Sequence, residues 1–301
     1  MSGTEYMYEG GASENKVRRD RFQDILFFSW LLLAGLLLVG CGSSEVTTTL
    51  SAEERFNTAK ALFDDESYLE AINEFTVVTL QFQASPFADD AQYYLGECRF
   101  MRREYLLAAS EYRMLINNMP ASPLVPEAQH KLGLCYYNLS PKVSLDQQYT
   151  RRAIDELQTF VEYYPGNEHA VDAEQKIQEL TTRLALKQYN AAVLYTKLED
   201  YKSAIIYFDD VIEKYHDTEY APLAYIGKVE ALMARRKYAD ADVEVNKFLT
   251  LYPNSVLRSE MEDLQKSIQK ELKSRQQVSG KESGSMEKLP TGSDRQSTIN
   301  R

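Results

Sequence analysis

The hydrophobic positions from Ser51 onward follow the helical period, and a longer repeat lies over that period. A tyrosine is followed three residues later by an alanine, and a bulky or apolar residue comes four positions after the alanine. Residues three and four apart lie on one face of a helix, so the alanine and the later residue share that face. The motif occurs at Tyr68–Ala71, Tyr105–Ala108, Tyr201–Ala204 and Tyr238–Ala241, followed by Phe75, Tyr112, Phe208 and Val245. The pattern predicts a series of similar amphipathic helices.

Prolines end several of these units, at Pro120, Pro165 and Pro253. A small alanine lets two antiparallel helices approach closely, the bulky residue fills the same face, and proline stops the helix. Alanine, a large apolar residue and proline in this order resemble the second helix of a tetratricopeptide repeat. Leu95-Gly96 and Leu132-Gly133 stand at the Leu-Gly position of the first helix. We therefore expect an all-α solenoid of about five helix pairs, wound as a right-handed superhelix.

The repeat is irregular at two joints. The alanines at positions 71, 108, 153, 204 and 241 are spaced 37, 45, 51 and 37 residues apart. We predict an insertion around residues 138–149 of the third unit and an added helical stretch over about 168–184 before the fourth. The units of the solenoid, residues 51–274, are about 51–86, 87–121, 122–167, 168–219 and 220–258, followed by a C-terminal helix. Residues 275–301 are polar and Gly/Ser-rich, and we predict a disordered tail there.

A fifteen-residue apolar run, Ile25–Val39, precedes the repeats. At about 1.5 Å per residue, a helix of this length is shorter than the ~30 Å hydrocarbon core of a bilayer. Basic residues before the run and a small residue after it favour a signal peptide with an extended n-region over residues 1–40. Residues 41–50 then form a flexible tether. The alternative is an N-terminal anchor helix in which Cys41 has no special role.

Leu38, Val39, Gly40 and Cys41 resemble the bacterial lipobox. In proteins with that motif, the cysteine thiol takes a diacylglycerol, the signal peptide is cut before the cysteine, and the new N-terminus is acylated. Several acyl chains, at ~0.8 kcal/mol per buried methylene, hold a soluble domain on a membrane. The resemblance implies that Cys41 carries covalent lipid and attaches the chain to a membrane.

Composition and motifs exclude several classes of function. The formal net charge is −11 without a basic stripe, which argues against nucleic acid as a partner. The sequence contains no Gly-rich phosphate loop or nucleophile elbow, so we expect neither catalysis nor a cofactor. His130, His169 and His216 lie in different units without ligand spacing, so we expect no metal. Cys98 and Cys135 hold equivalent positions in neighbouring units, and we expect two buried thiols.

Aromatic residues recur at two positions of the first helix in units one to three. The two positions are seven residues apart and therefore share one face of that helix. The residues are Phe56, Phe63, Tyr93, Phe100, His130 and Tyr137, with Lys60, Arg102 and Arg103 nearby. One interpretation is that the rings pack between helices. The other is that they line a groove for an extended, aromatic-bearing peptide, since exposed aromatic patches are typical of binding surfaces.

The irregular third unit and the helix after it carry a more specific resemblance. The segments concerned are Ser140–Thr150, Ala153-Ile154, Tyr163–Asn167 and Glu168–Tyr189, with Thr182–Ala185 inside the last. Together with the lipobox, they resemble the BamD (YfiO) family of outer-membrane β-barrel assembly lipoproteins. In that family, an insertion carrying an aspartate precedes a helix that ends in Tyr-Pro. The resemblance covers roughly residues 38–270.

This resemblance implies a non-enzymatic scaffold, anchored by lipid to the periplasmic face of the outer membrane. In the family, the amino-terminal units recognise unfolded outer-membrane protein precursors through a carboxy-terminal segment that ends in an aromatic residue. The carboxy-terminal units dock on the periplasmic repeats of a BamA-like barrel subunit. The candidate docking residues here are Asp209, Asp210, Glu213 and Lys214. The alternative function is that of another lipid-anchored tetratricopeptide adaptor, in pilus assembly or cell division.

Overall fold

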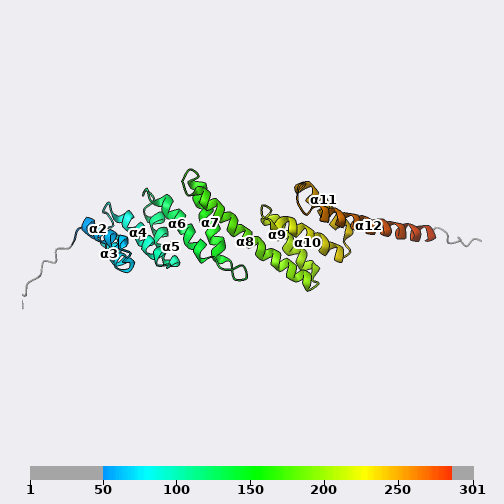
Figure 1. Ribbon diagram of the computed structural model, residues 1–301, viewed down its shortest axis with the longest axis horizontal. Helices are drawn as coiled ribbons and strands as arrows, with labels where there is room; N and C mark the ends of the chain where they lie inside the picture. The colour runs from blue at the N-terminus through cyan, green and yellow to red at the C-terminus, as the bar shows by residue number, and fades with distance from the viewer. Residues whose placement is uncertain (1–49, 287–301) are drawn as a thin grey trace, which may run out of the picture. The chain divides into compact units, whose positions relative to one another are not determined.

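The computed structural model describes residues 50–286, in which eleven α-helices and no strands occur. Ten of these helices form five consecutive pairs, and the eleventh follows them (Figure 1). The pairs are α2 (Ala52–Asp64) with α3 (Tyr68–Gln81), α4 (Ala88–Met101) with α5 (Tyr105–Asn118), α6 (Val125–Leu139) with α7 (Gln148–Tyr163), α8 (Ala170–Lys197) with α9 (Tyr201–Lys214), and α10 (Tyr220–Ala234) with α11 (Tyr238–Leu251), before α12 (Arg258–Met286). The predicted all-α class and tetratricopeptide-type helix pairs are confirmed, and the right-handed superhelix stays a prediction.

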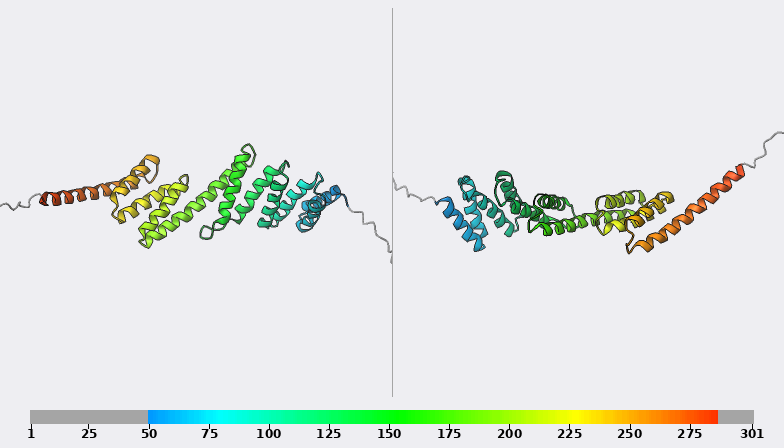
Figure 2. Two further views of the ribbon diagram at one scale, coloured as in Figure 1. Left: turned by 180° about the vertical axis from the view of Figure 1, so that it is seen from behind. Right: turned by 90° about the horizontal axis from the view of Figure 1, so that it is seen from above.

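Each helix packs on the one before it and the one after it, as the views in Figure 2 show from two further sides. The 28-residue helix α8 contributes side chains to the cores of two pairs. Leu180 in its first half belongs to the core of the third pair, whereas Ala192 in its second half belongs to the core of the fourth. The added helical stretch predicted before the fourth unit is therefore continuous with that unit's first helix.

In four of the five pairs, a small residue on the first helix lies opposite a large residue on the second. A Cβ atom added to Gly96 would lie 2.6 Å from the Tyr112 ring, and one added to Gly133 would lie 2.5 Å from Leu157 Cδ2. The equivalent residues share a buried cluster in two further pairs, Ala59 with Phe75 and Ala192 with Phe208, and in the fifth pair both positions are valine, Val229 and Val245. The glycine of the Leu-Gly motif is therefore a packing requirement at Gly96 and Gly133, since a Cβ atom there would overlap the side chain that faces it.

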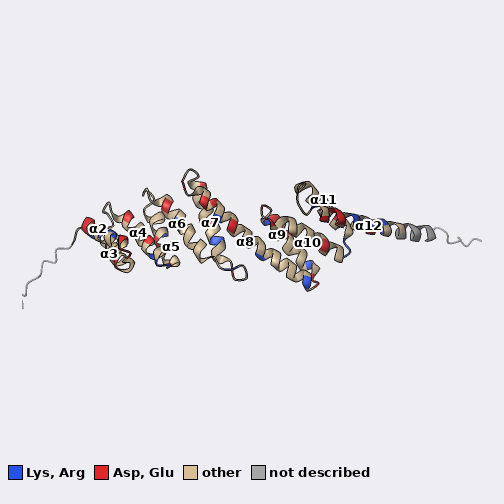
Figure 3. Cartoon of the chain, in the orientation of Figure 1, with Lys and Arg blue, Asp and Glu red and all other residues tan. Residues whose placement is uncertain are grey.

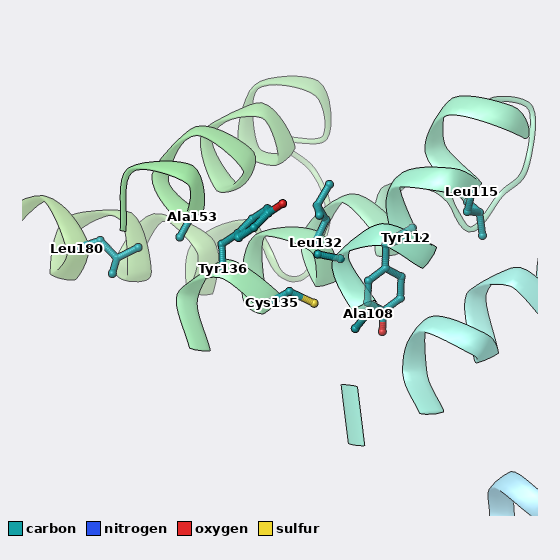
Figure 4. Close-up of a cluster of buried hydrophobic side chains, with 10 residues drawn as sticks. Ala108, Tyr112, Leu115, Leu132, Cys135, Tyr136, Ala153 and Leu180 are labelled. Carbon is teal, nitrogen blue, oxygen red and sulfur yellow. The ribbon is translucent and has the colours of Figure 1, made fainter. Parts of the chain in front are cut away.

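The two cysteines predicted to be buried lie in these cores. Cys98 and Cys135 are fully buried free thiols. Figure 4 shows Cys135 beside Leu132 and Tyr136 in the core that joins the second and third pairs. Burial raises the pKa of the Cys98 thiol to about 12, because the thiolate would lose its hydration there. The prediction of two buried thiols is confirmed.

Four of the five pairs share a turn with one residue in the left-handed backbone region. The residues are Glu66, Arg103, Glu199 and Arg236, with φ between 58° and 61°. In the first of these turns, Ser67 N donates to Leu62 O at 2.9 Å, which is the helix-ending bond of a Schellman motif. Glycine is the usual residue at this position, because it has no Cβ atom to disfavour a positive φ. The four charged side chains therefore destabilise the turn relative to glycine, and they give it a charge.

The third pair has a longer connection in place of that turn, organised around one buried amide. The Gln147 side chain is 1% exposed and its Nε2 donates to the carbonyls of Lys142 and Leu145 at 2.9 and 3.0 Å. Thr150 donates to Gln147 Oε1 at 2.7 Å. The aspartate of this insertion, Asp146, accepts a bond from the backbone of Gln148 at the start of α7. The insertion is therefore an ordered element.

The predicted ends of the chain fall largely outside the described residues. These include the signal peptide, the lipobox residues Leu38–Cys41 and nearly all of the tether. At the other end, the tail was predicted from residue 275, but helix α12 continues to Met286. Residues such as Gln276 and Gln277 have good helix propensity, so the helix can extend without an apolar face.

We predict that the substitution Gly227→Ala lowers the free energy of unfolding by about 1–2 kcal/mol, measured by chemical denaturation. A Cβ at this position of α10 would lie 2.7 Å from Cε1 of Phe208 on α9, which is too close for any ordinary contact. The better helix propensity of alanine, worth about 1 kcal/mol, offsets part of this clash.

The matched control is Gly166→Ala, because no atom lies within 4 Å of a Cβ added there. We expect it to change the free energy of unfolding by less than about 0.5 kcal/mol. Equal effects of the two substitutions would contradict the packing argument.

Candidate functional site

The predicted aromatic residues of the first pair lie in contact with other rings. The Phe56 ring centroid is 5.4 Å from that of Phe87 and 5.8 Å from that of Phe75. The ring centroid of Phe63 is 5.2 Å from that of Tyr94, and the Lys60 ammonium lies over both of these rings. All five rings belong to, or pack against, the core that joins α2, α3 and α4.

The second pair repeats this arrangement. The ring centroid of Tyr93 is 5.8 Å from that of Tyr112, and the ring centroid of Phe100 is 5.2 Å from that of Tyr105. Lys131 of the next pair lies over the Phe100 ring. The two predicted basic residues, Arg102 and Arg103, lie in the turn after α4, where Arg102 pairs with Glu104 at 2.8 Å.

In the third pair, Tyr137 has a partner from α8, and His130 has one from the residue just before that helix. The Tyr137 hydroxyl donates to Glu179 Oε2 at 2.6 Å. The His130 ring is 3% exposed and stacks on His169, with centroids 4.6 Å apart. The expectation that the histidines have no ligand spacing is therefore wrong for His130 and His169, because the loop before α8 returns to the start of α6.

These contacts explain the full burial of His130 and the partial burial of the other five predicted rings as packing between successive helices, which is the first of the two interpretations. The second interpretation, a ring-lined binding groove, stays a prediction. The sequence did not reveal which side the rings face, since Phe87 and Tyr94 come from positions outside the aligned pattern.

A groove of about 580 Å³ lies between α3, α4 and α5. Its sides carry exposed apolar side chains, with Leu80 68% and Met114 40% exposed. Its remaining lining residues are Thr76, Thr79, Gln83, Gln92, Leu95, Arg99, Glu111, Asn118 and Met119. None of the nine predicted groove residues lines it. A second hollow, around Pro120–Pro123, shares Gln83, Asn118 and Met119 with this groove and continues it along α5.

Polar residues at the base of the groove are tied to one another. Gln92 Nε2 donates to Glu111 Oε2 at 2.9 Å, and Arg99 Nε donates to Glu111 Oε1 at 3.0 Å. The same link recurs in the next pair, where Gln129, 37 residues after Gln92, donates to Glu156, 45 residues after Glu111, at 3.0 Å. These bonds make the base of the groove rigid. Because the glutamines and the glutamates hold equivalent positions in neighbouring units, an alignment of the repeats could have revealed these bonds.

The predicted docking residues lie on α9, and they differ in how far their side chains are free to contact another protein. Asp209 accepts from Lys228 of α10 at 2.6 Å, and Asp210 pairs with Lys214 at 2.6 Å. Glu213 is exposed, and the Lys214 side chain is 60% exposed. Asp209 therefore holds two helix pairs together, whereas Glu213 and Lys214 face solvent. Figure 3 shows acidic residues spread over many of the described helices.

The Lys228 ammonium links two carboxylates, and one of these also pairs with a second ammonium. It lies 2.6 Å from Asp209 and 3.0 Å from Glu244, and Glu244 also pairs with Lys247 at 2.9 Å. Burial alone would lower the pKa of Lys228, but hydrogen bonds to Asp209 and Glu244 raise it above its ordinary value. The ammonium therefore stays charged at neutral pH and joins α9, α10 and α11.

Comparison with known proteins gives the family. The family model described as YfiO, outer membrane lipoprotein, matches residues 49–235, more than half of the chain. The chain belongs to this family. The resemblance inferred from the third unit and the lipobox is confirmed. The matched residues include all helices from α2 to α10.

Two relatives share the name outer membrane protein assembly factor BamD. The one from Rickettsia prowazekii is 28% identical over 229 residues, which are 75% of this chain and 91% of the relative. The one from Caulobacter vibrioides is 28% identical over 207 residues, 67% of this chain and 68% of the relative. A solved tetratricopeptide-repeat protein from Bacteroides fragilis is 14% identical, with a TM-score of 0.42, over 73% of this chain and 99% of its own.

Across residues 50–286, no helix has both the length and the apolar character needed to cross a membrane.

We predict that Lys228→Met lowers the free energy of unfolding by about 1–3 kcal/mol, because it leaves the 10%-exposed Glu244 with one partner fewer. The control is Lys266→Met, whose 76%-exposed ammonium pairs only with Asp263 on the surface. We expect less than about 0.5 kcal/mol for the control by chemical denaturation. A loss for Lys228→Met no larger than that of the control would refute the role of this link.

Proposed function

We propose that this chain is a lipid-anchored scaffold for outer-membrane protein assembly on the periplasmic face of the outer membrane. The observation that carries the proposal is the family match over residues 49–235, together with two relatives named outer membrane protein assembly factor. The Cys41 lipid supplies the anchor, and the helix pairs supply binding surfaces without taking part in a chemical reaction.

The groove between α3 and α5 is the proposed contact for unfolded β-barrel precursors. Successive side chains of an extended chain point to opposite sides, so a barrel segment presents one apolar row. That row can lie on Leu80, Met114 and Met119. Methionine side chains adapt to ligands of differing shape, which suits a scaffold that receives many sequences. The rigid base of Gln92, Arg99 and Glu111 offers polar groups to the backbone of the ligand.

The proposed docking surface for a BamA-like barrel subunit lies on α9, at the exposed Glu213 and Lys214. These two residues present both signs of charge to solvent. Such charges affect association rate and specificity more than the fold. Asp209 takes no direct part, because it is paired with Lys228.

We predict that a photo-crosslinking residue in place of Leu80 captures unfolded β-barrel precursors in growing cells. The matched control replaces Leu251, an equally apolar residue that is 61% exposed on α11, outside the groove. Western blotting for a barrel protein should detect an adduct at position 80 and much less at position 251. Equal adducts at both positions, or none at 80, would contradict the proposed contact.

Depletion of the whole protein tests the role more broadly. We expect the levels of many outer-membrane barrels to fall together, because each would pass through the same scaffold. Normal barrel levels with the failure of one other envelope process, such as pilus assembly or division, would overturn the proposal.

A further inference from the structure

One cluster of side chains is unrelated to either proposed binding surface. Glu127 and His130 lie one turn apart near the start of α6, and His169 and Asp172 lie one turn apart at the start of α8. Residues three apart share a helix face, so each helix presents one carboxylate and one imidazole to the other. We call these four residues the two-histidine cluster.

The distances in this cluster suit a common ligand. Potential ligand atoms of Glu127, His130 and His169 all lie within 4.8 Å of one another. His169 Nε2 is 3.4 Å from Glu127 Oε2, and His130 Nε2 is 3.8 Å from Asp172 Oδ2. Donors on a tetrahedral zinc ion, at about 2.0–2.1 Å from it, are roughly 3.4 Å from each other. The cluster is therefore close to the size of a metal site.

His130 provides a second, independent indication. Its ring is 3% exposed, and both of its nitrogens are buried without a hydrogen-bond partner. A buried polar atom without a partner costs about 1–3 kcal/mol, so such atoms are rare in the absence of a role. The repeat-equivalent residues Phe56 and Tyr93 carry no ring nitrogen, so packing alone does not require histidine here.

We propose that Glu127, His130 and His169 bind a divalent transition-metal ion, with Zn²⁺ as the best match. Two imidazoles and one carboxylate form a donor set that zinc takes in proteins. Asp172 is within reach as the fourth donor if it turns away from Lys176. The stacked imidazoles, 12° from parallel, must rotate so that a lone pair of each points to the ion.

The electrostatic surroundings both oppose and favour a cation. Lys131 and Lys176 lie near His130, and the positive ends of two helix dipoles face the cluster. The carboxylates of Glu127, Asp172 and Glu168 counter these charges, because each lies within 4 Å of an imidazole nitrogen.

A bound ion would connect the first helices of the third and fourth pairs. This is the joint at which the repeat is irregular and where α8 leaves one core for the next. The His130 ring also contacts Phe160 of α7, with centroids 5.0 Å apart. The ion would therefore stabilise α6, α7 and α8 as one unit.

The test uses the purified full-length chain, treated with a chelator and then titrated with ZnCl₂ by calorimetry. We expect one equivalent to bind in the natural protein. His169→Gln and Glu127→Gln should weaken binding at least tenfold, since even residues behind metal ligands often contribute that much. His130→Phe should also abolish binding while retaining a ring against Phe160.

The control is His216→Gln, which removes the third histidine, an exposed residue outside the cluster. It should bind Zn²⁺ like the natural protein, and Zn²⁺ should raise the thermal unfolding midpoint of both but not that of His130→Phe. Circular dichroism shows whether each variant is folded. The proposal is overturned if the natural protein binds no stoichiometric Zn²⁺, if His169→Gln and Glu127→Gln bind it unchanged, or if His216→Gln loses it equally.

Discussion

The contact between a small residue on one helix and a large residue on the next determines how closely each pair can pack. Gly96 meets the Tyr112 ring and Gly133 meets Leu157, with no room for another carbon atom between them. Where the first residue is larger, as at Val229, the second is smaller, as at Val245. The helices of different pairs can therefore pack with similar closeness although the residues at these two positions differ. Both proposed binding surfaces depend on this approach, because it positions the exposed side chains of neighbouring helices.

Polar links act between these packed contacts. The bonds between Gln92 and Glu111 join the helices of one pair, whereas Lys228 joins the fourth pair to the fifth. In a repeat protein each unit contacts only its neighbours, so stability depends on every such interface. The chain replaces the common turn by an ordered insertion around Gln147 only in the third pair. The two-histidine cluster lies at the joint that follows this insertion.

Much of the fold could be predicted from the sequence, because its determinants are local. Alanine, glycine and aromatic residues at fixed spacing specify helix faces, and those faces pack as expected for Ala71 with Phe75 and for Ala108 with Tyr112. The family was also predictable, because the third unit departs from the repeat in a characteristic way.

The surfaces were harder to predict, because they depend on residues brought together from different units. The direction of the Phe56 ring depends on Phe87 and Tyr94, which the aligned positions do not include. Likewise, His169 precedes a helix whose start is shifted by the insertion. Its stacking on His130 could therefore be seen only in the folded structure. The apolar sides of the groove have no motif, because Leu80 and Met114 share only their exposure.

A double-mutant cycle at Gly96 and Tyr112 tests the packing rule most directly, by installing the valine pair found naturally at positions 229 and 245. We expect Gly96→Val and Tyr112→Val each to destabilise the protein in denaturant unfolding, through a clash and a cavity respectively. The double variant should lose less free energy of unfolding than the sum of the two, with a coupling of about 1–3 kcal/mol. Strictly additive losses would show that the two residues do not set each other's size and would contradict this account.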